Sequence, residues 1–125
     1  MIFDTDVLIW VQRGNAKAAR AVDRSRDRYV SVLTYMDLLQ AAQNKKQHEI
    51  VISFLNRCGF QTLPLTENIG HRAAVYVAEY ALSHGLRAAD AIIAATATEN
   101  NLPLCSANAK HYRAIQELKL KVFRP

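Results

Sequence analysis

The chain has 125 residues, of which 50% are hydrophobic and 22% are charged, and its formal net charge is +5. This composition excludes a disordered chain and suits a single domain with one core. No apolar run approaches the roughly 20 residues of a membrane-spanning helix, and no basic region followed by a long apolar stretch opens the chain. We therefore expect a cytoplasmic protein without membrane attachment. The positive charge permits nucleic-acid binding without requiring it.

The predicted elements alternate between strands and helices. A short apolar segment at the start runs into two carboxylates, Asp4 and Asp6, and is followed by another apolar segment. A later helix is predicted to end near His84 and Gly85, because glycine adopts the left-handed cap conformation at little cost. The alanine-rich segment 88–98 predicts a helix buried against the sheet. Strands are predicted at residues 1–4, 29–32, 61–64, 103–106 and 121–123.

This alternation predicts an α/β fold with a central, mostly parallel sheet of four to five strands flanked by helices. In such a sheet the carboxyl ends of all strands, with the helix starts that follow them, lie at one edge. Polar clusters occur at these junctions, in segments 4–6, 31–37, 87–90 and 106–111. We therefore expect one acidic site assembled from the whole length of the chain.

Each candidate acid also has a purely structural interpretation. Asp4 could cap the helix after the first strand, and Asp37 could close a capping box with Thr34. Asp90 could lie in the first turn of a helix, where the macrodipole favours negative charge. Carboxylates brought together would repel by roughly 4 kcal/mol for a pair about 4 Å apart at an effective dielectric of about 20. A divalent cation removes that penalty, and oxygen ligands near a phosphate favour Mg²⁺ or Mn²⁺.

Other residue types give weaker signals. Cys58 and Cys105 lack the paired spacing of a zinc site and the density of a disulfide scaffold, so we expect buried thiols. The four histidines have no ligand-like spacing, which argues against zinc. Lys17, Arg20 and Arg24 recur at helical spacing and form either a solvated helix face or a patch that binds phosphates.

Four segments of the chain, in order, resemble the PIN-domain ribonucleases, and within them the VapC-type toxins of toxin–antitoxin pairs. The segments are DTDVLI at 4–9, SVLTYMDLL at 31–39, LRAADAIIAATA at 86–97 and LCSANAKHY at 104–112. The resemblance covers nearly the entire length and implies a single PIN-like domain over residues 1–125. It implies an endoribonuclease that uses Mg²⁺ or Mn²⁺ to hydrolyse RNA phosphodiesters.

Carried over position by position, the resemblance makes Asp4 the central metal ligand and Asp90 another ligand. Asp37 becomes the counterpart of the glutamate that is usual in the family. Asp6 or Thr5 would be an accessory group.

The same resemblance gives Ser106 and Asn108 the role of orienting water or substrate. Two positions depart from the family pattern. Asp37 is one methylene shorter than glutamate and is expected to reach a metal through water, and His111 stands where many relatives have a fourth acid. With fewer anionic ligands, one of two metal positions is weakened or lost.

The resemblance further implies a cognate antitoxin protein, an RNA substrate and a homodimer. An antitoxin segment is expected in an apolar groove between the early helices. The groove would be formed by Val7, Leu8, Trp10, Leu38 and Leu39. The alternative is that all five belong to the core.

Two other functions stay open from the sequence. One is a catalytically weak or inactive PIN-like module that binds RNA or protein. The other is a haloacid dehalogenase-like phosphatase, with Asp4 as covalent nucleophile and Asp6 as acid. That chemistry also needs an acidic pair to close its Mg²⁺ site, and the sequence offers no convincing one.

Overall fold

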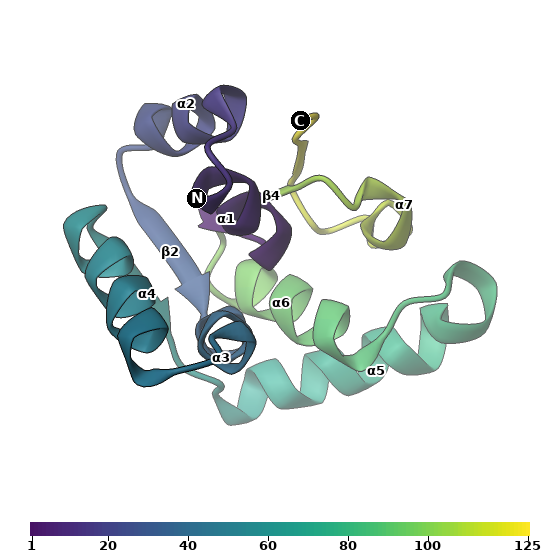
Figure 1. Ribbon diagram of the computed structural model, residues 1–125. Helices are drawn as coiled ribbons and strands as arrows, with labels where there is room; N and C mark the ends of the chain where they lie inside the picture. The colour runs from purple at the N-terminus through teal and green to yellow at the C-terminus, as the bar shows by residue number, and fades with distance from the viewer.

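The computed structural model describes all residues from Met1 to Pro125 and contains one sheet of five parallel strands (Figure 1). The strand order is β3-β2-β1-β4-β5, so the first strand lies at the centre. The α/β prediction is therefore confirmed, with five strands. Their bounds are Ile2–Phe3 (β1), Arg28–Ser31 (β2), Phe60–Leu63 (β3), Leu104–Ser106 (β4) and Leu120–Val122 (β5).

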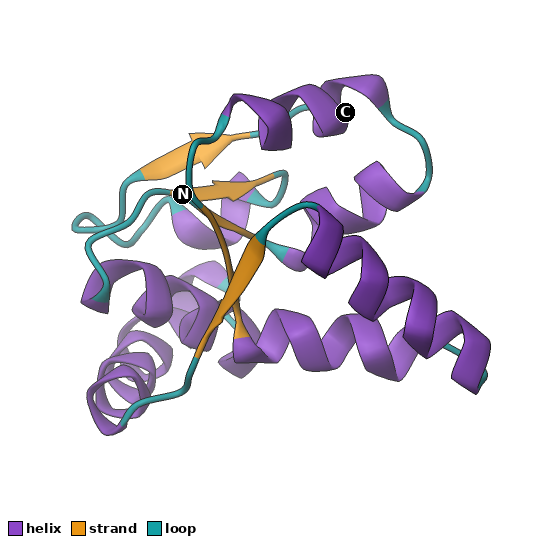
Figure 2. Cartoon of the chain, turned by 90° about the vertical axis from the view of Figure 1, so that its left-hand side faces the viewer, coloured by secondary structure: helices purple, strands orange, loops and turns teal.

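Seven helices connect and cover the strands (Figure 2). Side chains of successive strand residues point to opposite faces of a sheet, and both faces are covered here. Ile2 and Leu104 pack into one hydrophobic cluster, whereas Phe3 and Cys105 pack into the other. The helices are Thr5–Gln12 (α1), Ala16–Arg24 (α2), Val32–Ala41 (α3), Lys45–Arg57 (α4), Glu67–His84 (α5), Ala88–Glu99 (α6) and Ala109–Tyr112 (α7).

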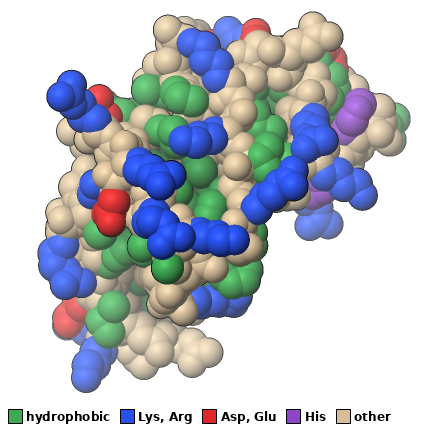
Figure 3. Space-filling view, turned by 90° about the horizontal axis from the view of Figure 1, so that it is seen from above, with side chains coloured by type: hydrophobic (Ala, Val, Ile, Leu, Met, Phe, Trp, Pro, Cys, Tyr) green, Lys and Arg blue, Asp and Glu red, His purple; other side chains and the backbone are tan.

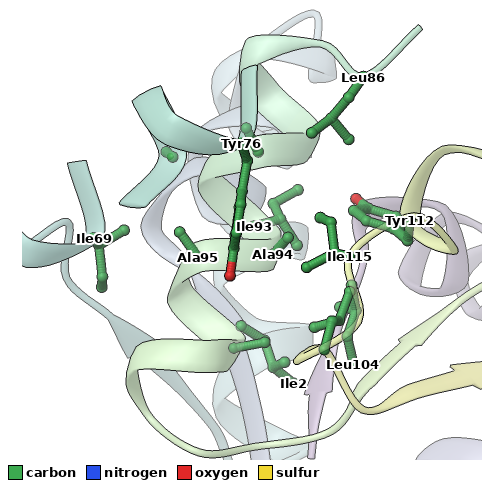
Figure 4. Packing of buried hydrophobic residues seen from close by; sticks show 14 residues of the cluster. Ile2, Ile69, Tyr76, Leu86, Ile93, Ala94, Ala95, Leu104, Tyr112 and Ile115 are labelled. Carbon is green, nitrogen blue, oxygen red and sulfur yellow. The ribbon is translucent and has the colours of Figure 1, made fainter. Parts of the chain in front are cut away.

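The alanine-rich helix α6 is buried as predicted. Its Ala91, Ala94, Ala95 and Ala97 have essentially no exposed surface, and these small side chains let α6 approach the sheet and α5 closely. Figure 4 shows α6 at the centre of this cluster, with Tyr112 entering from the C-terminal segment. Because α6 is fixed on several sides, the residues of its first turn are held firmly relative to the sheet.

The helix ends follow local sequence in most places. Asp4 caps α1, and Gly85 closes α5 with φ of 68°, as expected. The capping box of Thr34 and Asp37, the structural alternative considered for Asp37, does not form. Helix α3 begins earlier, at Val32, and Ser31 caps it by accepting a hydrogen bond from the Leu33 backbone N–H. Strand bounds differ from the predictions by at most one residue.

The early helices do not present the expected apolar groove. Val7, Leu8 and Leu38 are at most 3% exposed and belong to the core, so for these three the core interpretation is correct. Trp10 and Leu39 are half-buried at its margin, and the Arg13 guanidinium lies 5.8 Å from the centre of the Trp10 ring. An amphipathic helix buries one face, and in α1 and α3 the sheet takes that face. No helix has the length and hydrophobicity needed to cross a bilayer.

Candidate active site

Asp4 lies at the end of the central strand and is only 6% exposed. Its Oδ1 accepts a hydrogen bond from the Thr5 backbone N–H at 2.8 Å, which is its capping role. Its Oδ2 accepts from the Ser106 hydroxyl at 2.8 Å and from the Tyr112 hydroxyl at 3.0 Å. Asp4 therefore caps a helix with one oxygen and belongs to a buried polar network with the other.

Asp90 is joined to Asp4 by the same tyrosine. It lies in the first turn of α6, where it accepts from the Arg87 backbone N–H at 3.4 Å. The Tyr112 hydroxyl lies 3.5 Å from Asp90 Oδ1. A single phenol thus stands between two carboxylates that are 86 positions apart in the chain. Asp90 and Asp4 are on the same edge of the sheet, as the sequence predicts.

Asp37 approaches the site through Thr5. The Thr5 hydroxyl lies 3.4 Å from Asp37 Oδ2 and 3.0 Å from the hydroxyl of Thr34. Asp37 is half-buried in the middle of α3 rather than at its start. The structure therefore brings Asp4, Asp37 and Asp90 to one edge, joined through Thr5 and Tyr112.

Asp6 sits beside this network with an incomplete set of hydrogen bonds. Its Oδ2 accepts from the Ala107 backbone N–H at 3.1 Å, whereas its Oδ1 is buried without a partner. Burial, and then the negative charge of Asp4, raise the pKa of Asp6 to about 6. An orphaned buried carboxylate oxygen is costly and is typical of a functional site.

The electrostatics of the edge are unbalanced. Burial raises the pKa of Asp4, and the charge of Asp90 adds to the rise, against the hydrogen bonds from Ser106, Tyr112 and Thr5 that lower it. No lysine or arginine forms a salt bridge with Asp4, Asp6 or Asp37. Burial, and then the negative charges of Asp4 and Asp90, raise the pKa of Tyr112, so this phenol stays protonated as a donor.

His111 and Asn108 extend the network outward from Asp90. His111 Nδ1 lies 3.2 Å from Asp90 Oδ2 and 2.9 Å from the Asn108 side-chain nitrogen. One ring nitrogen cannot donate and accept at once, so it either donates to Asp90 or accepts from Asn108. Ser106 has no exposed surface, and it accepts from the Asn108 backbone N–H while it donates to Asp4.

The donor set can be compared with the needs of a metal ion. No three side chains of aspartate, glutamate, histidine or cysteine converge on one point. The carboxylates are oxygen-only ligands with unmatched charge, and Mg²⁺ commonly takes one or two carboxylates and completes its shell with water. The residues therefore fit a hydrated ion of this kind, and they do not fit a closed cage such as structural zinc requires.

Sequence reasoning missed Tyr112. The residue lies inside the quoted segment 104–112, but an aromatic residue there is equally typical of plain core packing. Nothing local indicates that its hydroxyl meets two acids, because that contact depends on where α7 docks.

The chain matches the model of the PIN domain over residues 1–117. It belongs to the PIN domain family. Among solved structures, a toxin–antitoxin complex from Klebsiella pneumoniae is similar at 27% identity and a TM-score of 0.80, over 94% of this chain and 93% of the other. FitAcB from Neisseria gonorrhoeae is similar at 25% identity and a TM-score of 0.72, over 95% of this chain and 94% of the other.

VapBC-1 from nontypeable Haemophilus influenzae shares the fold at 23% identity and a TM-score of 0.77, over 98% of each chain. No curated protein matches the sequence. The resemblance to the PIN domain and to chains of toxin–antitoxin complexes is thus confirmed for nearly the whole length. Both the fold of this chain and its match to the PIN domain model favour the PIN-domain interpretation over the phosphatase alternative.

Proposed function

We propose that this PIN domain is an endoribonuclease dependent on Mg²⁺ or Mn²⁺ and serves as the toxin of a toxin–antitoxin pair. The observation that carries the proposal is the pair of Asp4, which is buried, and Asp90, which is half-buried. The Tyr112 hydroxyl lies between them, and neither forms a salt bridge with a lysine or arginine. Unmatched negative charge at the carboxyl edge of a parallel sheet suits a cation that also binds phosphate.

Asp4, Asp90 and Asp37 are the residues that would hold the ion, directly or through water. When bound, such an ion lowers the pKa of a coordinated water and offsets negative charge that develops on the phosphate oxygens. The protein's own contribution is to hold the carboxylates in place. Ser106 and Tyr112 fix one oxygen of Asp4, and the helix α1 backbone fixes the other.

Asp6 and Asn108 have supporting roles in this proposal. Asp6 accepts from the Ala107 backbone N–H and so anchors the turn that leads to Asn108. The Asn108 side chain is half-buried beside His111, where it can orient substrate. Ser106 is too deeply buried to touch substrate and acts through Asp4. Positioning of this kind contributes to catalysis because it removes the cost of reorganising the site during reaction.

The toxin role rests on the likeness to the Klebsiella pneumoniae toxin–antitoxin complex. An antitoxin partner follows from that likeness, and the homodimer stays a prediction. We place the antitoxin over the hollow between α1, α3 and α4, which is lined by Leu38, Ala41 and Ile50. Ile50 is 54% exposed there, and Met36 on α3 is 49% exposed. Exposed apolar side chains of this size favour a protein contact.

The test is RNA cleavage by the purified chain with Mg²⁺ or Mn²⁺, with and without a chelator. Asp4→Asn should lower the cleavage rate at least about 100-fold, because an amide cannot replace an anionic ligand. The variant should still fold cooperatively, since asparagine also caps helices well. Some stability should be lost, because one amide cannot cap α1 and also accept from both Ser106 and Tyr112. Wild-type cleavage that persists in the chelator, or in Asp4→Asn, would refute the mechanism.

A second candidate function is an inactive module that binds RNA without cutting it. The lack of three converging ligands and the presence of His111 beside Asp90 favour it. Wild-type chain that binds RNA but releases no cleavage product with either metal would support this alternative.

A further inference from the structure

A basic groove lies next to the carboxyl-edge site. It encloses about 560 Å³ between α7 and the segment that follows β5. Lys110, Arg113 and Arg124 line it, with His84 at the end of α5. No aspartate or glutamate side chain takes part in its lining. In this respect it differs from the cleft along α5, which contains Glu99 and Glu117.

The three basic side chains of the groove have no polar partner within the protein. Lys110, Arg113 and Arg124 are exposed, and none forms a salt bridge or a side-chain hydrogen bond. The molecule seen from above, the side on which Figure 1 places α2 and the C-terminus, shows many lysines and arginines and few acids (Figure 3). Such positive charge without internal partners attracts a polyanion.

The groove is directly connected to the acidic network. Its wall residue Phe123 donates its backbone N–H to the carbonyl of Ser106 at 2.8 Å, and Ser106 holds Asp4. Asn108 lines the groove and lies within hydrogen-bond distance of His111, which contacts Asp90. The groove and the carboxylates therefore share the segment from Ser106 to His111, so a strand bound in the groove lies next to the site.

We infer that this groove, formed by Lys110, Arg113 and Arg124, binds the backbone phosphates of single-stranded RNA beside the bond that is cut. The inference rests on the proposed nuclease function for its substrate and names where that substrate lies. Lysine and arginine contacts to phosphate position the strand without reading bases. An extended strand fits better than a duplex, because an open groove beside one sheet edge admits one backbone.

The test measures RNA affinity apart from cleavage. All proteins carry Asp4→Asn, and a fluorescein-labelled single-stranded RNA of about 12 nucleotides is followed by anisotropy at several salt concentrations. Adding K110Q, R113Q and R124Q together should weaken binding about tenfold or more. The slope of log affinity against log salt should fall by about 2, since each phosphate contact on a single strand contributes about 0.7.

A matched control removes the same charge from helix α2. K17Q, R20Q and R24Q alter three exposed cations outside the groove and should weaken binding less than about threefold. Equal losses in the two triple variants would show that only net charge matters and would overturn the proposal. Unchanged affinity in the groove variant would overturn it as well.

Three further outcomes separate this proposal from an acidic protein occupant and from the proposed nuclease function. Poly-glutamate should compete with RNA for the groove at least about tenfold less well than unlabelled RNA; equal competition would identify an acidic protein segment as the occupant and refute the RNA proposal. Groove-dependent binding by a chain that never cleaves RNA would support the groove while refuting the nuclease function. Cleavage by the wild type with no dependence of binding on the groove would do the reverse.

Discussion

Two clusters of carboxylates and tyrosine lie in different parts of this PIN domain and differ in how their charge is matched. At the carboxyl edge, the Tyr112 hydroxyl lies between Asp4 and Asp90, and neither acid forms a salt bridge with a lysine or arginine; only His111 lies beside Asp90. The second cluster, which we term the arginine cluster, joins α5, α6 and the segment before β5. It consists of Arg72, Tyr76, Thr98, Glu99 and Glu117.

In the arginine cluster every charge has a partner. Arg72 Nε lies 2.5 Å from Glu99 and its Nη1 lies 2.8 Å from Glu117, while Tyr76 donates to Glu117. The hydrogen bond from Tyr76 and the guanidinium of Arg72 lower the pKa of Glu117. At the carboxyl edge the direction is opposite, because burial and Asp90 raise the pKa of Asp4.

The difference separates a structural cluster from a functional one. In the arginine cluster one guanidinium contacts both carboxylates and ties three elements together, so this cluster already contains a cation, whereas no lysine or arginine forms a salt bridge at the carboxyl edge. Unmatched buried carboxylates destabilise the fold on their own, and their presence is explained when a cation binds there. The two clusters therefore provide paired substitutions of the same chemistry with different expected outcomes.

The largest expected difference is between Asp4→Asn and Glu117→Gln. Both replace a carboxylate by an amide. Asp4→Asn should abolish cleavage and the rise in melting temperature that added Mg²⁺ gives the wild type, because binding to the native state stabilises it. Glu117→Gln should retain both within about twofold. Thermal melts with and without Mg²⁺ check this, and equal effects of the two variants would remove the distinction between the clusters.

The next difference concerns the two buried tyrosines. Tyr112→Phe should destabilise the metal-free chain by about 1.5–3 kcal/mol, because a buried hydrogen bond to a charged group is lost. Added Mg²⁺ should recover part of this loss, since the freed oxygens of Asp4 and Asp90 become available to the ion.

The matched variant Tyr76→Phe should cost about 0.5–1.5 kcal/mol, because Arg72 still pairs with Glu117. Mg²⁺ should give no recovery beyond that seen in the wild type. Urea unfolding of Tyr112→Phe and Tyr76→Phe, each with and without Mg²⁺, measures the four free energies of unfolding, and the wild type is measured alongside. Recovery in Tyr76→Phe but none in Tyr112→Phe would place the ion elsewhere.

The smallest effect is on pH dependence. The pKa of Asp6 is about 6 in the folded chain and 3.8 without the fold, so the folded state binds the extra proton. With chelator present, the contribution of Asp6 to the free energy of unfolding should therefore be greatest below pH 3.8. It should be lost as the pH rises through about 6. Allowing for partial exposure, the change is roughly 1–2 kcal/mol.

Asp6→Asn should flatten this part of the profile, and Glu117→Gln should not. Unfolding by urea at a series of pH values between about 4 and 7 shows the slope. An identical slope in wild type and Asp6→Asn would mean that the raised pKa of Asp6 has no thermodynamic effect on the fold.

Much of the architecture could be predicted from the sequence because it depends on local patterns. The short apolar segment before Asp4 and Asp6 predicted the end of the first strand, and the alanine-rich segment predicted a buried helix. The parallel arrangement then placed Asp4 and Asp90 on one edge. These predictions hold because strand period, helix capping and glycine conformation act over a few residues.

The contacts between distant side chains could be decided only by the tertiary structure. Tyr112 meets Asp4 only after α7 docks beside α6, and Arg72 meets residues 27 and 45 positions away. Val7 and Leu8 entered the core because the sheet covered the apolar face of α1, although the same pattern suits a partner's groove. Periodicity identifies which face of a helix is apolar, whereas the packing of the whole chain determines what covers that face.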